Sequence, residues 1–361
     1  MVVNVGVDLH KTCFTVFVKH EKQQFAEYRT NEQGYKRFTN RISAWKEAGL
    51  QVRVGVESTG NTRFFKNTTE KAGAEVIVIN TLKFKVVTES VKKTDRHDAA
   101  TIAEFLEKDM LPEAKLCSEK SEQLRRLLKV RSTLICTIVT VKNQIHALLT
   151  GLGMEDTKAS LQSKRGRQKI LDVLEKAGNG LVVQPLFNTI EQLYESVKSI
   201  EAELAKLTQE DKTVQLLMSI PGCGPIIACT IRAYTDDIKR FASAKKYAAY
   251  AGLVPSVRNS NMTVHYGKIT KHGPEGLRTA FVQLVMGIRR CTYTANWRII
   301  ERYEYMKQHK GSGKSIIATA RKLATIVWYM LSSETPFDNT FMIDKILNKK
   351  AFLMQTLLTN Y

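Results

Sequence analysis

The sequence predicts a mixed fold, with an α/β amino-terminal domain followed by largely helical regions. In the first 110 residues, short segments rich in β-branched residues alternate with helical stretches. Two long runs of apolar residues at spacings of three and four follow, and the last third is basic and rich in turns. At about 150 residues per domain, the 361 residues accommodate two or three domains with real cores.

The amino-terminal region contains four predicted strands, each short and bounded by charged or turn residues. Two helices are predicted between the strands, and each ends at a glycine suited to a helix C-terminal cap, Gly49 or Gly73. The strands are expected at residues 2–8, 13–18, 52–56 and 75–79, and the helices at 32–48 and 61–72. The first ~110 residues therefore predict a compact α/β domain.

The middle of the chain predicts two long helices, each with a narrow apolar seam. The first seam runs from Leu124 to Leu148, with Arg131 in one of its positions, and the second runs from Leu186 to Leu207. Such helices pair either with each other, as an antiparallel hairpin, or with another protomer. The polar, basic stretch 158–169 between them is predicted to be a loop or a phosphate-contacting segment.

After Gln215 the chain is turn-rich, basic and helical. A Pro-Gly-x-Gly turn within 220–228 is predicted to open a helix, a polar loop is expected after Pro255, and helices are expected to continue to about Leu331. The predicted regions are an α/β catalytic domain at 1–112, a helical, coiled-coil-like linker or oligomerisation region at 113–212, a helical carboxy-terminal domain at 213–335 and a tail at 336–361.

The charge of the chain points to a polyanionic partner. The formal net charge is +20, the sequence pI is about 9.6, and 13 of the surplus positive charges lie in residues 216–361. This concentration of charge indicates a basic module rather than a uniformly basic surface, and such a module favours binding to nucleic acid. The six cysteines have no zinc-finger spacing, and neither a signal peptide nor a membrane span is predicted, so we expect reduced thiols and a cytoplasmic, nucleoid-associated protein with no membrane partner.

Four carboxylates form the candidate catalytic site. Asp8 and Glu57 each end a predicted strand, in the similar segments VGVDLHK and VGVESTG. Asp95 and Asp98 are spaced i, i+3, which places both side chains on one face of a helix. Each acid has a structural alternative: Asp95 as a helix N-cap with Asp98 in the first turn, Glu57 ending a strand, and Asp8 in a turn. Together, their order favours a cluster that holds divalent cations for phosphoryl chemistry.

These segments, with KTDRHDA, resemble the Asp-Glu-Asp-Asp signature of the insertion sequence 110 (IS110/IS1111-like) family of transposases. The resemblance implies a RuvC-like, ribonuclease-H-like amino-terminal domain. It also implies that Asp8, Glu57, Asp95 and Asp98 are catalytic and bind Mg²⁺ or Mn²⁺.

The segment 240–283 resembles the carboxy-terminal domain of the same family. In that family, a loop serine five residues after a proline is the nucleophile that forms a covalent link to DNA. That position is Ser260 here, after Pro255. The family usually has Ser-Gly, whereas Asn261 follows the serine in this chain, and Asn also tolerates left-handed backbone angles. Ser256 is the nearest competing serine, and His265 and nearby lysines are the local groups available as a base.

Residues that bind nucleic acid are also predicted in the last third of the chain. The turn at 220–228 has the pattern of a helix-hairpin-helix element, whose backbone N–H groups hold a phosphate. Basic side chains neutralise backbone phosphates, and interleaved aromatic residues such as Tyr247 and Trp297 either stack on bases or belong to the core. The predicted nucleic-acid contacts are Gly222, Gly224, Lys245, Lys246, Arg258, Lys268, Lys271 and Arg278.

The predicted function is that of an insertion-sequence transposase or recombinase, which cuts and rejoins DNA through a serine-DNA intermediate. The resemblance, which runs from Val5 to about Leu331, further implies a homo-oligomer (dimer or tetramer) guided by a structured bridge RNA that pairs with donor and target DNA. The alternatives are a metal-dependent Holliday-junction nuclease or DNA invertase, and a noncatalytic nucleic-acid-binding protein. The absence of any His-x-x-Arg triplet disfavours a tyrosine recombinase, and the first serine, Ser43, lies too late for a resolvase-type nucleophile.

Overall fold

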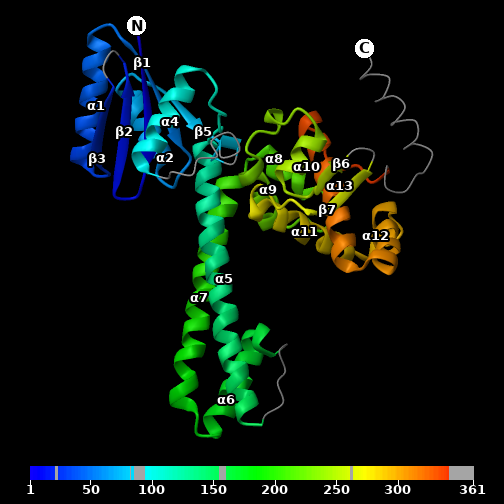
Figure 1. Cartoon of the computed structure of the whole chain (residues 1–361). Helices are drawn as coiled ribbons and strands as arrows, with labels where there is room; N and C mark the ends of the chain where they lie inside the picture. Colours follow the sequence, from blue (N-terminus) through cyan, green and yellow to red (C-terminus); the bar gives the residue numbers. More distant parts are fainter. Residues whose placement is uncertain (21–22, 82, 85–93, 154–159, 261–262, 341–361) are drawn as a thin grey trace. The chain divides into compact units, whose positions relative to one another are not determined.

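The computed structural model describes residues 1–20, 23–81, 83–84, 94–153, 160–260 and 263–340 (Figure 1). The chain divides into two compact units, Met1–Cys117 and Ser118 onward. Residues 113–117 belong to the first unit, where Ala114 donates a backbone hydrogen bond to Val78. The finer division of the second unit stays a prediction.

The first unit is built on a five-stranded sheet in the order β3-β2-β1-β4-β5. Strand β1 pairs antiparallel with β2 and parallel with β4, and β4 pairs parallel with β5. The strands are β1 (Val2–Leu9), β2 (Cys13–Lys19), β3 (Gln24–Arg29), β4 (Gln51–Glu57) and β5 (Glu75–Ile79). The sheet confirms the predicted α/β character of this region.

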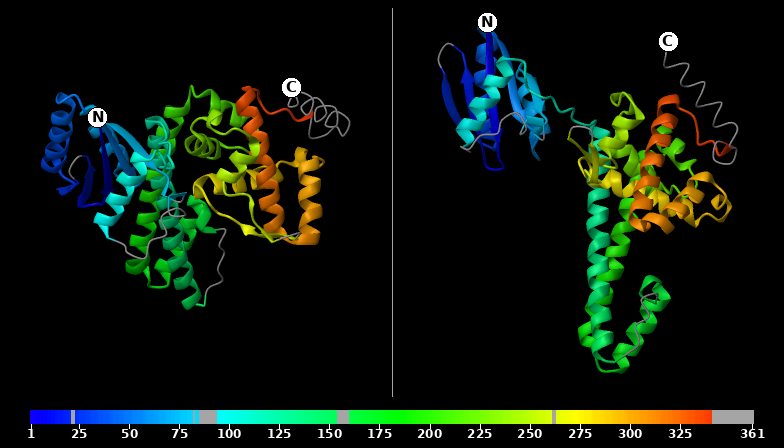
Figure 2. Two further views of the ribbon diagram at one scale, coloured as in Figure 1. Left: turned by 45° about the horizontal axis from the view of Figure 1, so that its top comes forward. Right: turned by 45° about the vertical axis from the view of Figure 1, so that its right-hand side comes forward.

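Helices cover both faces of this sheet (Figure 2). The helices α1 (Glu32–Glu47) and α2 (Thr62–Lys71) pack on one face, where Phe38 and Phe65 are fully buried against alternate valines of β1 and β4. On the same face, the ring of Phe14 lies 5.4 Å from that of Phe38. Helix α4 (Asp95–Glu107) packs against the opposite face.

The four predicted strands and two predicted helices are all present, with ends within one residue or two of those expected. Strand β3 was not predicted, because QFAEYR mixes polar and apolar residues and lacks a β-branched run. Its place at the edge of the sheet explains this composition, since an edge strand has one neighbour and exposes most of its side chains.

The second unit begins with two long helices, α5 (Glu119–Gly151) and α7 (Gly180–Thr208). They pack antiparallel within the chain, with Leu124 near Leu204 at one end and Ile145 near Val183 at the other. Arg131, the polar residue in the first seam, makes an ion pair with Glu201 at 2.7 Å. Of the two predicted arrangements, the structure therefore shows the hairpin within one chain.

The expectation of a loop at 158–169 is wrong from Ser160 onward. Residues Ser160–Gln162 form a 3₁₀ turn and α6 spans Lys164–Lys176, while 154–159 lie outside the described residues. Ser163 caps α6 by accepting a hydrogen bond from the Gly166 N–H at 3.0 Å. The apolar residues of α6 that pack against α7 come after its basic first turn. The composition of 158–169 alone therefore does not indicate where the helix begins.

The rest of the second unit is a helical bundle with one hairpin of strands. The bundle core contains Tyr247, Phe281, Trp297 and Val327, all buried. The helices are α8 (Lys212–Met218), α9 (Pro225–Thr235), α10 (Ala244–Tyr250), α11 (Glu275–Arg290), α12 (Arg298–Lys310) and α13 (Ser312–Ser333), with 3₁₀ turns at Ile238–Arg240 and Thr292–Thr294.

The polar loop expected after Pro255 is instead an antiparallel hairpin of β6 (Pro255–Ser260) and β7 (Thr263–Ile269). Val257, Val264 and other β-branched residues favour strands here, but they alternate with polar residues that resemble a loop composition. The carboxy-terminal region is therefore mostly helical rather than wholly so. Among the described residues, no helix has the length and apolarity needed to cross a bilayer.

Candidate active site

Two of the four predicted acids lie at the ends of neighbouring parallel strands. Val7 of β1 pairs with Val56 of β4, so Asp8 and Glu57 occupy the next position of each strand. Because paired residues of parallel strands share a face, both side chains project to the same side of the sheet. The side chain of Asp8 is only 14% exposed.

Two glycines show that this is the face covered by α4. A Cβ atom on Gly6 would lie 2.6 Å from the backbone nitrogen of Ala103, and one on Gly55 would lie 2.8 Å from the side chain of Ile102. Gly6 and Gly55 each precede an acid by two residues and therefore share its face. Helix α4 therefore packs directly on this strip of glycines, which is Gly6 and Gly55. The acids lie on the same face, two residues further along each strand.

Helix α4 begins with the other two acids. Thr94 is its N-cap, accepting a hydrogen bond on Oγ from the His97 N–H at 3.2 Å, so Asp95 is the first helical residue and not the cap. Asp98 lies three residues further on, and both acids are in the first turn. Negative charge at this end of a helix is favourable, because the free N–H groups and the macrodipole are positive there.

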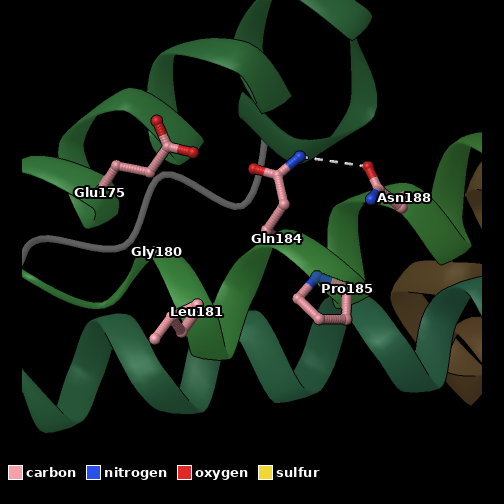
Figure 3. Close-up of a pocket in the computed structure, with 6 residues that line it drawn as sticks. All are labelled: Glu175, Gly180, Leu181, Gln184, Pro185 and Asn188. Carbon is pink, nitrogen blue, oxygen red and sulfur yellow. Dashed lines mark hydrogen bonds between the residues drawn. The ribbon is translucent and has the colours of Figure 1, made fainter.

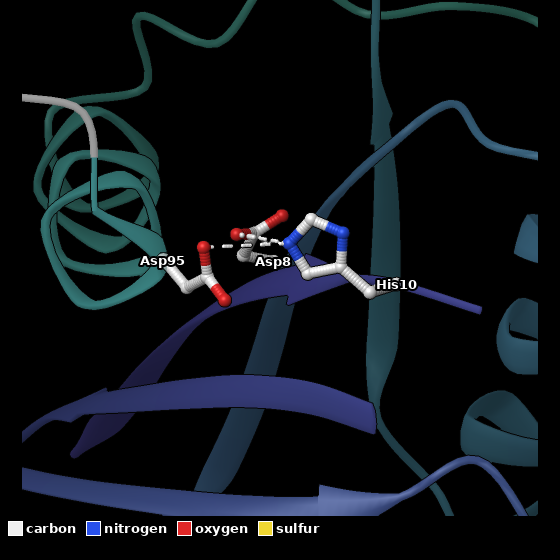
Figure 4. Close-up of side chains that lie close together, drawn as sticks. All are labelled: Asp8, His10 and Asp95. Atoms are coloured by element: carbon white, nitrogen blue, oxygen red, sulfur yellow. Dashed lines mark hydrogen bonds and ion pairs between the residues drawn. The ribbon is translucent and has the colours of Figure 1, made fainter. Parts of the chain in front are cut away.

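The side chains of Asp8, Asp95 and His10 converge at the start of α4 (Figure 4). His10 Nε2 lies 3.0 Å from Asp8 Oδ2 and 3.6 Å from Asp95 Oδ1, and one ligand atom from each residue falls within 4.8 Å of the others. Glu57 and Asp98 are outside this close set. The structure thus brings Asp8 and Asp95 together directly and leaves Glu57 and Asp98 around them.

The pKa values report the crowding of negative charge at this point. Burial raises the pKa of Asp8 above its ordinary value of 3.8, and the charges of Asp95 and Asp98 raise it further, while His10 opposes the rise. Desolvation lowers the pKa of His10, but Asp8 and Asp95 outweigh it and raise that pKa overall. A site that destabilises its own carboxylate charges gains from a bound cation.

The donor set fits a hard divalent cation. Carboxylate oxygens are the ligands that Mg²⁺ and Mn²⁺ prefer, and Asp8 and Asp95 supply them from two rigid elements. The imidazole of His10 is a softer ligand, and in this structure it is the hydrogen-bond partner of Asp8. His10 is not among the residues predicted from the sequence, although its position two residues after Asp8, just beyond a strand end, is a signal for it.

The serine region lies in the other unit. Ser260 is the last residue of β6, and its backbone pairs with Thr263 of β7. Asn261 lies outside the described residues, as do the side chains of Ser260, Arg258 and His265. A Cβ atom on Gly267 would overlap the hydroxyl oxygen of the competing Ser256, so this hydroxyl occupies the space beside the glycine.

The predicted phosphate-binding turn has a structural role at one of its glycines. Gly222 has φ of +75°, and a Cβ atom there would lie 2.6 Å from the Ile288 nitrogen of α11. Gly224 is the N-cap of α9, and Pro225 occupies the first helical position, where its missing N–H is not needed. Apart from its chain neighbours, no heavy atom of the described residues would lie within 4 Å of a Cβ on Gly224, so that end of the turn is open among them.

The predicted phosphate contacts with described side chains are mostly exposed. Lys245, Lys246, Lys268 and Lys271 are exposed, and none of the described carboxylates forms an ion pair with them. Arg278 is half-buried and donates to the Lys271 carbonyl oxygen at 3.2 Å, so it also holds the chain between β7 and α11. Of the two alternatives for Tyr247 and Trp297, the structure shows that both belong to the core, because their exposed fractions are 0% and 2%.

Two pockets are lined by residues of the second unit. One, of about 600 Å³, lies at the turn from α6 to α7 and is lined by Leu181, Pro185 and Glu175, with Gln184 hydrogen-bonded to Asn188 at 3.2 Å (Figure 3). The second, of about 670 Å³, lies beside the start of α8 and the end of α13. Asp236, Asp237 and Glu334 line the second pocket, but among the described residues only Asp8, His10 and Asp95 each bring a ligand atom within 4.8 Å of the others. The acidic cluster is therefore the stronger candidate for catalysis.

Comparison with known proteins adds an independent line of evidence. A family model for the DEDD transposases of IS110, described as "Transposase", matches residues 5–154, and one described as "Transposase IS116/IS110/IS902 family" matches residues 214–304. The transposase for insertion sequence element IS1111A of Coxiella burnetii is 26% identical over 301 residues, 80% of either chain.

Two further relatives match over most of their length. The transposase for insertion sequence element IS1328 of Yersinia enterocolitica is 26% identical over 339 residues, 92% of this chain and 98% of the relative. The pilin gene-inverting protein of Moraxella bovis is 26% identical over 343 residues, 92% of this chain and 97% of the relative. The two matched models span more than half of the chain in consistent order, and the chain belongs to the IS110 family of transposases, which are DNA-processing enzymes.

Proposed function

We propose that this transposase cuts and rejoins DNA strands with a Mg²⁺ or Mn²⁺ ion held by Asp8, Glu57, Asp95 and Asp98 and with Ser260 as the nucleophile. Transposases of this DEDD type typically use a divalent metal ion. The observation that carries the proposal is the convergence of Asp8 and Asp95 on the face of the sheet covered by α4.

The acids are assigned as the metal ligands because of their placement. Asp8 and Asp95 face each other, Glu57 follows the same strip of glycines as Asp8, and the charge of Asp98 reaches Asp8. A bound divalent cation would stabilise the negative charge that develops on the oxygens of the scissile phosphate. His10 orients the Asp8 carboxylate through the 3.0 Å hydrogen bond.

In the proposed cleavage step, the hydroxyl oxygen of Ser260 attacks the scissile phosphorus. A phosphodiester bond to serine forms, the bond from phosphorus to the leaving deoxyribose oxygen breaks, the serine proton passes to a base, and the leaving oxygen gains a proton. Attack by a free deoxyribose hydroxyl on the serine phosphodiester reverses these exchanges and rejoins the strands. The serine assignment is supported by the family resemblance of the segment around Pro255 and by the match of residues 214–304.

The partners follow from the family. We propose donor and target DNA as substrates, a structured guide RNA that selects them by base pairing, and a dimer or tetramer in which the acid-bearing and serine-bearing regions of different protomers meet. We also retain 113–212 as a helical linker or assembly region and the turn at Gly222 and Gly224 as a helix-hairpin-helix element. The exposed lysines of the 213–335 region are compatible with recognition of backbone phosphates.

DNA inversion is a second candidate function. Two relatives are named pilin gene-inverting proteins, from Moraxella bovis and Moraxella lacunata, and both match 92% of this chain. Inversion and transposition use the same cutting and joining chemistry, and they differ in whether the two recombining sites lie in one molecule. A substrate that carries both sites in inverted orientation separates them.

The test is to incubate the full-length protein with Mg²⁺, element-derived RNA and end-labelled donor DNA, and to look for a denaturation-resistant adduct. We expect an adduct that maps to Ser260, is lost in Ser260→Ala and persists in Ser256→Ala. An adduct retained in Ser260→Ala overturns the serine assignment. Cleavage without any adduct, dependent on Asp8 and not on Ser260, supports instead a nuclease that uses water.

A further inference from the structure

Helix α12 carries a stripe of cationic and aromatic side chains on its exposed face. Arg298, Arg302, Tyr305 and His309 are spaced by four, three and four residues, which places them on one side of the helix. All four are exposed, whereas Tyr303 on the other side is buried. At about 1.5 Å per residue the stripe extends for about 16 Å.

Two rings of the stripe lie close together at a tilt. The centroids of Tyr305 and His309 lie 4.2 Å apart at an interplanar angle of 33°. The Nδ1 atom of His309 lies 2.7 Å from the Tyr305 carbonyl oxygen, an arrangement in which Nδ1–H donates and fixes the imidazole against the helix. Tyr305 is nevertheless 62% exposed, so one large, pre-oriented aromatic surface faces solvent.

The cations of the stripe are available to an anionic ligand. Among the described carboxylates, none lies within ion-pair distance of Arg298 or Arg302. The nearby Glu304 is engaged by Arg289 at 3.3 Å and by Lys307 at 3.5 Å. Glu301 borders the stripe as a single exposed acid, so the net charge of this face is positive.

We infer that this stripe binds a single-stranded segment of nucleic acid, with a base stacked on Tyr305 and neighbouring phosphates on Arg298 and Arg302. An aromatic ring stacks on any unpaired base, and guanidinium groups pair with phosphates without reading sequence. A duplex offers phosphates but keeps its bases stacked inside, so it uses the arginines and not the ring. Tyrosine and arginine are also frequent in protein interfaces, so the test below includes the oligomeric mass as an outcome.

The inference rests on the proposed function only in that a strand-exchanging enzyme exposes unpaired strands. Tyr305 and His309 lie beyond the range 214–304 matched by the family model, whereas Arg298 and Arg302 lie within it. The stripe uses none of the four acids, Ser260 or the predicted phosphate contacts. The DNA strand displaced during recombination and an unpaired loop of RNA have the same chemistry, and the experiment distinguishes them.

The experiment measures the affinity of the full-length protein for labelled single-stranded DNA, single-stranded RNA and duplex DNA of equal length, without metal. Tyr305→Leu removes the ring and keeps an apolar side chain, and Tyr305→Phe keeps the ring. We expect Tyr305→Leu to weaken single-strand binding by about tenfold and duplex binding by less than about twofold, with Tyr305→Phe close to the parent. Tyr329→Leu, at a tyrosine of α13 that is 46% exposed, is the matched control and should bind as the parent does.

Two further measurements guard the interpretation. The double variant Arg298→Gln with Arg302→Gln should bind both single strands and duplex with a shallower dependence of log affinity on log salt concentration. The change in slope should correspond to the loss of about two phosphate contacts. A photoreactive pyrimidine in the single strand should cross-link to the peptide that contains Tyr305. The preferred strand, DNA or RNA, is the one for which Tyr305→Leu has the larger effect.

Equal single-strand binding by Tyr305→Leu and the parent overturns the inference, as does a change in oligomeric mass in that variant, which would indicate a protein contact. Both variants are at an exposed position, and an unchanged melting temperature shows that they fold. If Tyr305→Leu does not weaken single-strand binding, the proposed Asp8-dependent cleavage is not affected by that result. Failure of the proposed cleavage chemistry leaves Tyr305-dependent binding intact, so the two failures are distinguishable.

Discussion

Gly6 of β1 lies directly against Ala99 of α4, so closely that a Cβ atom on Gly6 would overlap the Ala99 carbonyl oxygen. This contact fixes the distance between the sheet and the helix at the point where Asp8 and Asp95 meet. The geometry of the candidate metal site therefore depends on a residue with no side chain.

The first prediction concerns this contact. Gly6→Ala should destabilise the protein by about 1–3 kcal/mol, because the methyl group forces α4 away from the sheet. It should also reduce metal-dependent cleavage more than DNA binding, because Asp95 moves with α4. Denaturant unfolding and a cleavage assay check both effects. Gly60→Ala is the control, since no heavy atom of the described residues, other than those of its chain neighbours, would lie within 4 Å of its Cβ. Equal stability of the two variants would contradict the prediction.

The second prediction concerns the charge of Asp8. Its raised pKa means that the ionised carboxylate opposes folding in the absence of metal, above that pKa. Asp8→Asn should therefore raise the melting temperature of the metal-free protein, abolish the stabilisation produced by added Mg²⁺ and abolish cleavage, while sparing nucleic-acid binding. Thermal unfolding with and without Mg²⁺ tests this, and an unchanged Mg²⁺ effect in the variant would exclude Asp8 as a ligand.

The third prediction concerns a buried ionic network at the start of the second unit. Arg232 lies 3.1 Å from Asp211 Oδ2, and Asp236 accepts hydrogen bonds from Ser118 and Ser121. Burial raises the pKa of both aspartates, but their hydrogen-bond and cationic partners outweigh it and lower both pKa values below 3.8. Their contribution to stability is therefore complete above the ordinary pKa and is lost as the pH falls below 3.8, through the lowered values.

Replacing Arg232 should change both the stability and its dependence on pH. Arg232→Met should cost about 3 kcal/mol at neutral pH, because it leaves the nearly buried Asp211 with less compensation, and should shift acid unfolding to higher pH. Unfolding free energies measured between neutral and acidic pH give both numbers. Arg126→Met, at a guanidinium whose side chain is 73% exposed, should change stability by less than about 1 kcal/mol. Similar losses in the two variants would refute the network's role.

The fourth prediction separates core aromatics from binding aromatics. Tyr247 is fully buried, and its hydroxyl lies 2.7 Å from Thr235 Oγ1. Tyr247→Phe should lower the free energy of unfolding by about 1–2 kcal/mol through the lost buried hydrogen bond. Affinity for nucleic acid should not change, and a loss of affinity in a variant of parental stability would return Tyr247 to the binding surface.

The sequence predicted most of the amino-terminal sheet, because Val3, Val5 and Val7 bury one face and make β1 a strongly hydrophobic segment. It predicted the order of the acids but could not place Glu57 and Asp98 relative to Asp8, since distances between side chains depend on how far α4 approaches the sheet. Gly6 and Gly55 carried that information, but a glycine in a strand does not say what packs against it.

The carboxy-terminal region was harder to predict for a different reason. The hairpin that ends at Ser260 is built from β-branched residues alternating with polar ones, a pattern shared with exposed loops. The burial of Tyr247 and the exposure of Tyr305 depend on which side of a short helix faces the bundle. His10 was missed because its role comes from two carboxylates, one of them 85 residues away in sequence, that approach it only in the folded chain.

The pairing of α5 with α7 within one chain has a thermodynamic consequence. The apolar seam of each helix is already buried against the other helix. The seams of two copies of the chain therefore cannot pair with each other unless both hairpins open first. Unfolding of this hairpin in a single, unassembled chain is a unimolecular event, so the melting temperature of that chain should be independent of protein concentration. Assembly into a larger complex must then use outward-facing residues, and it can proceed without exchange of helices between copies.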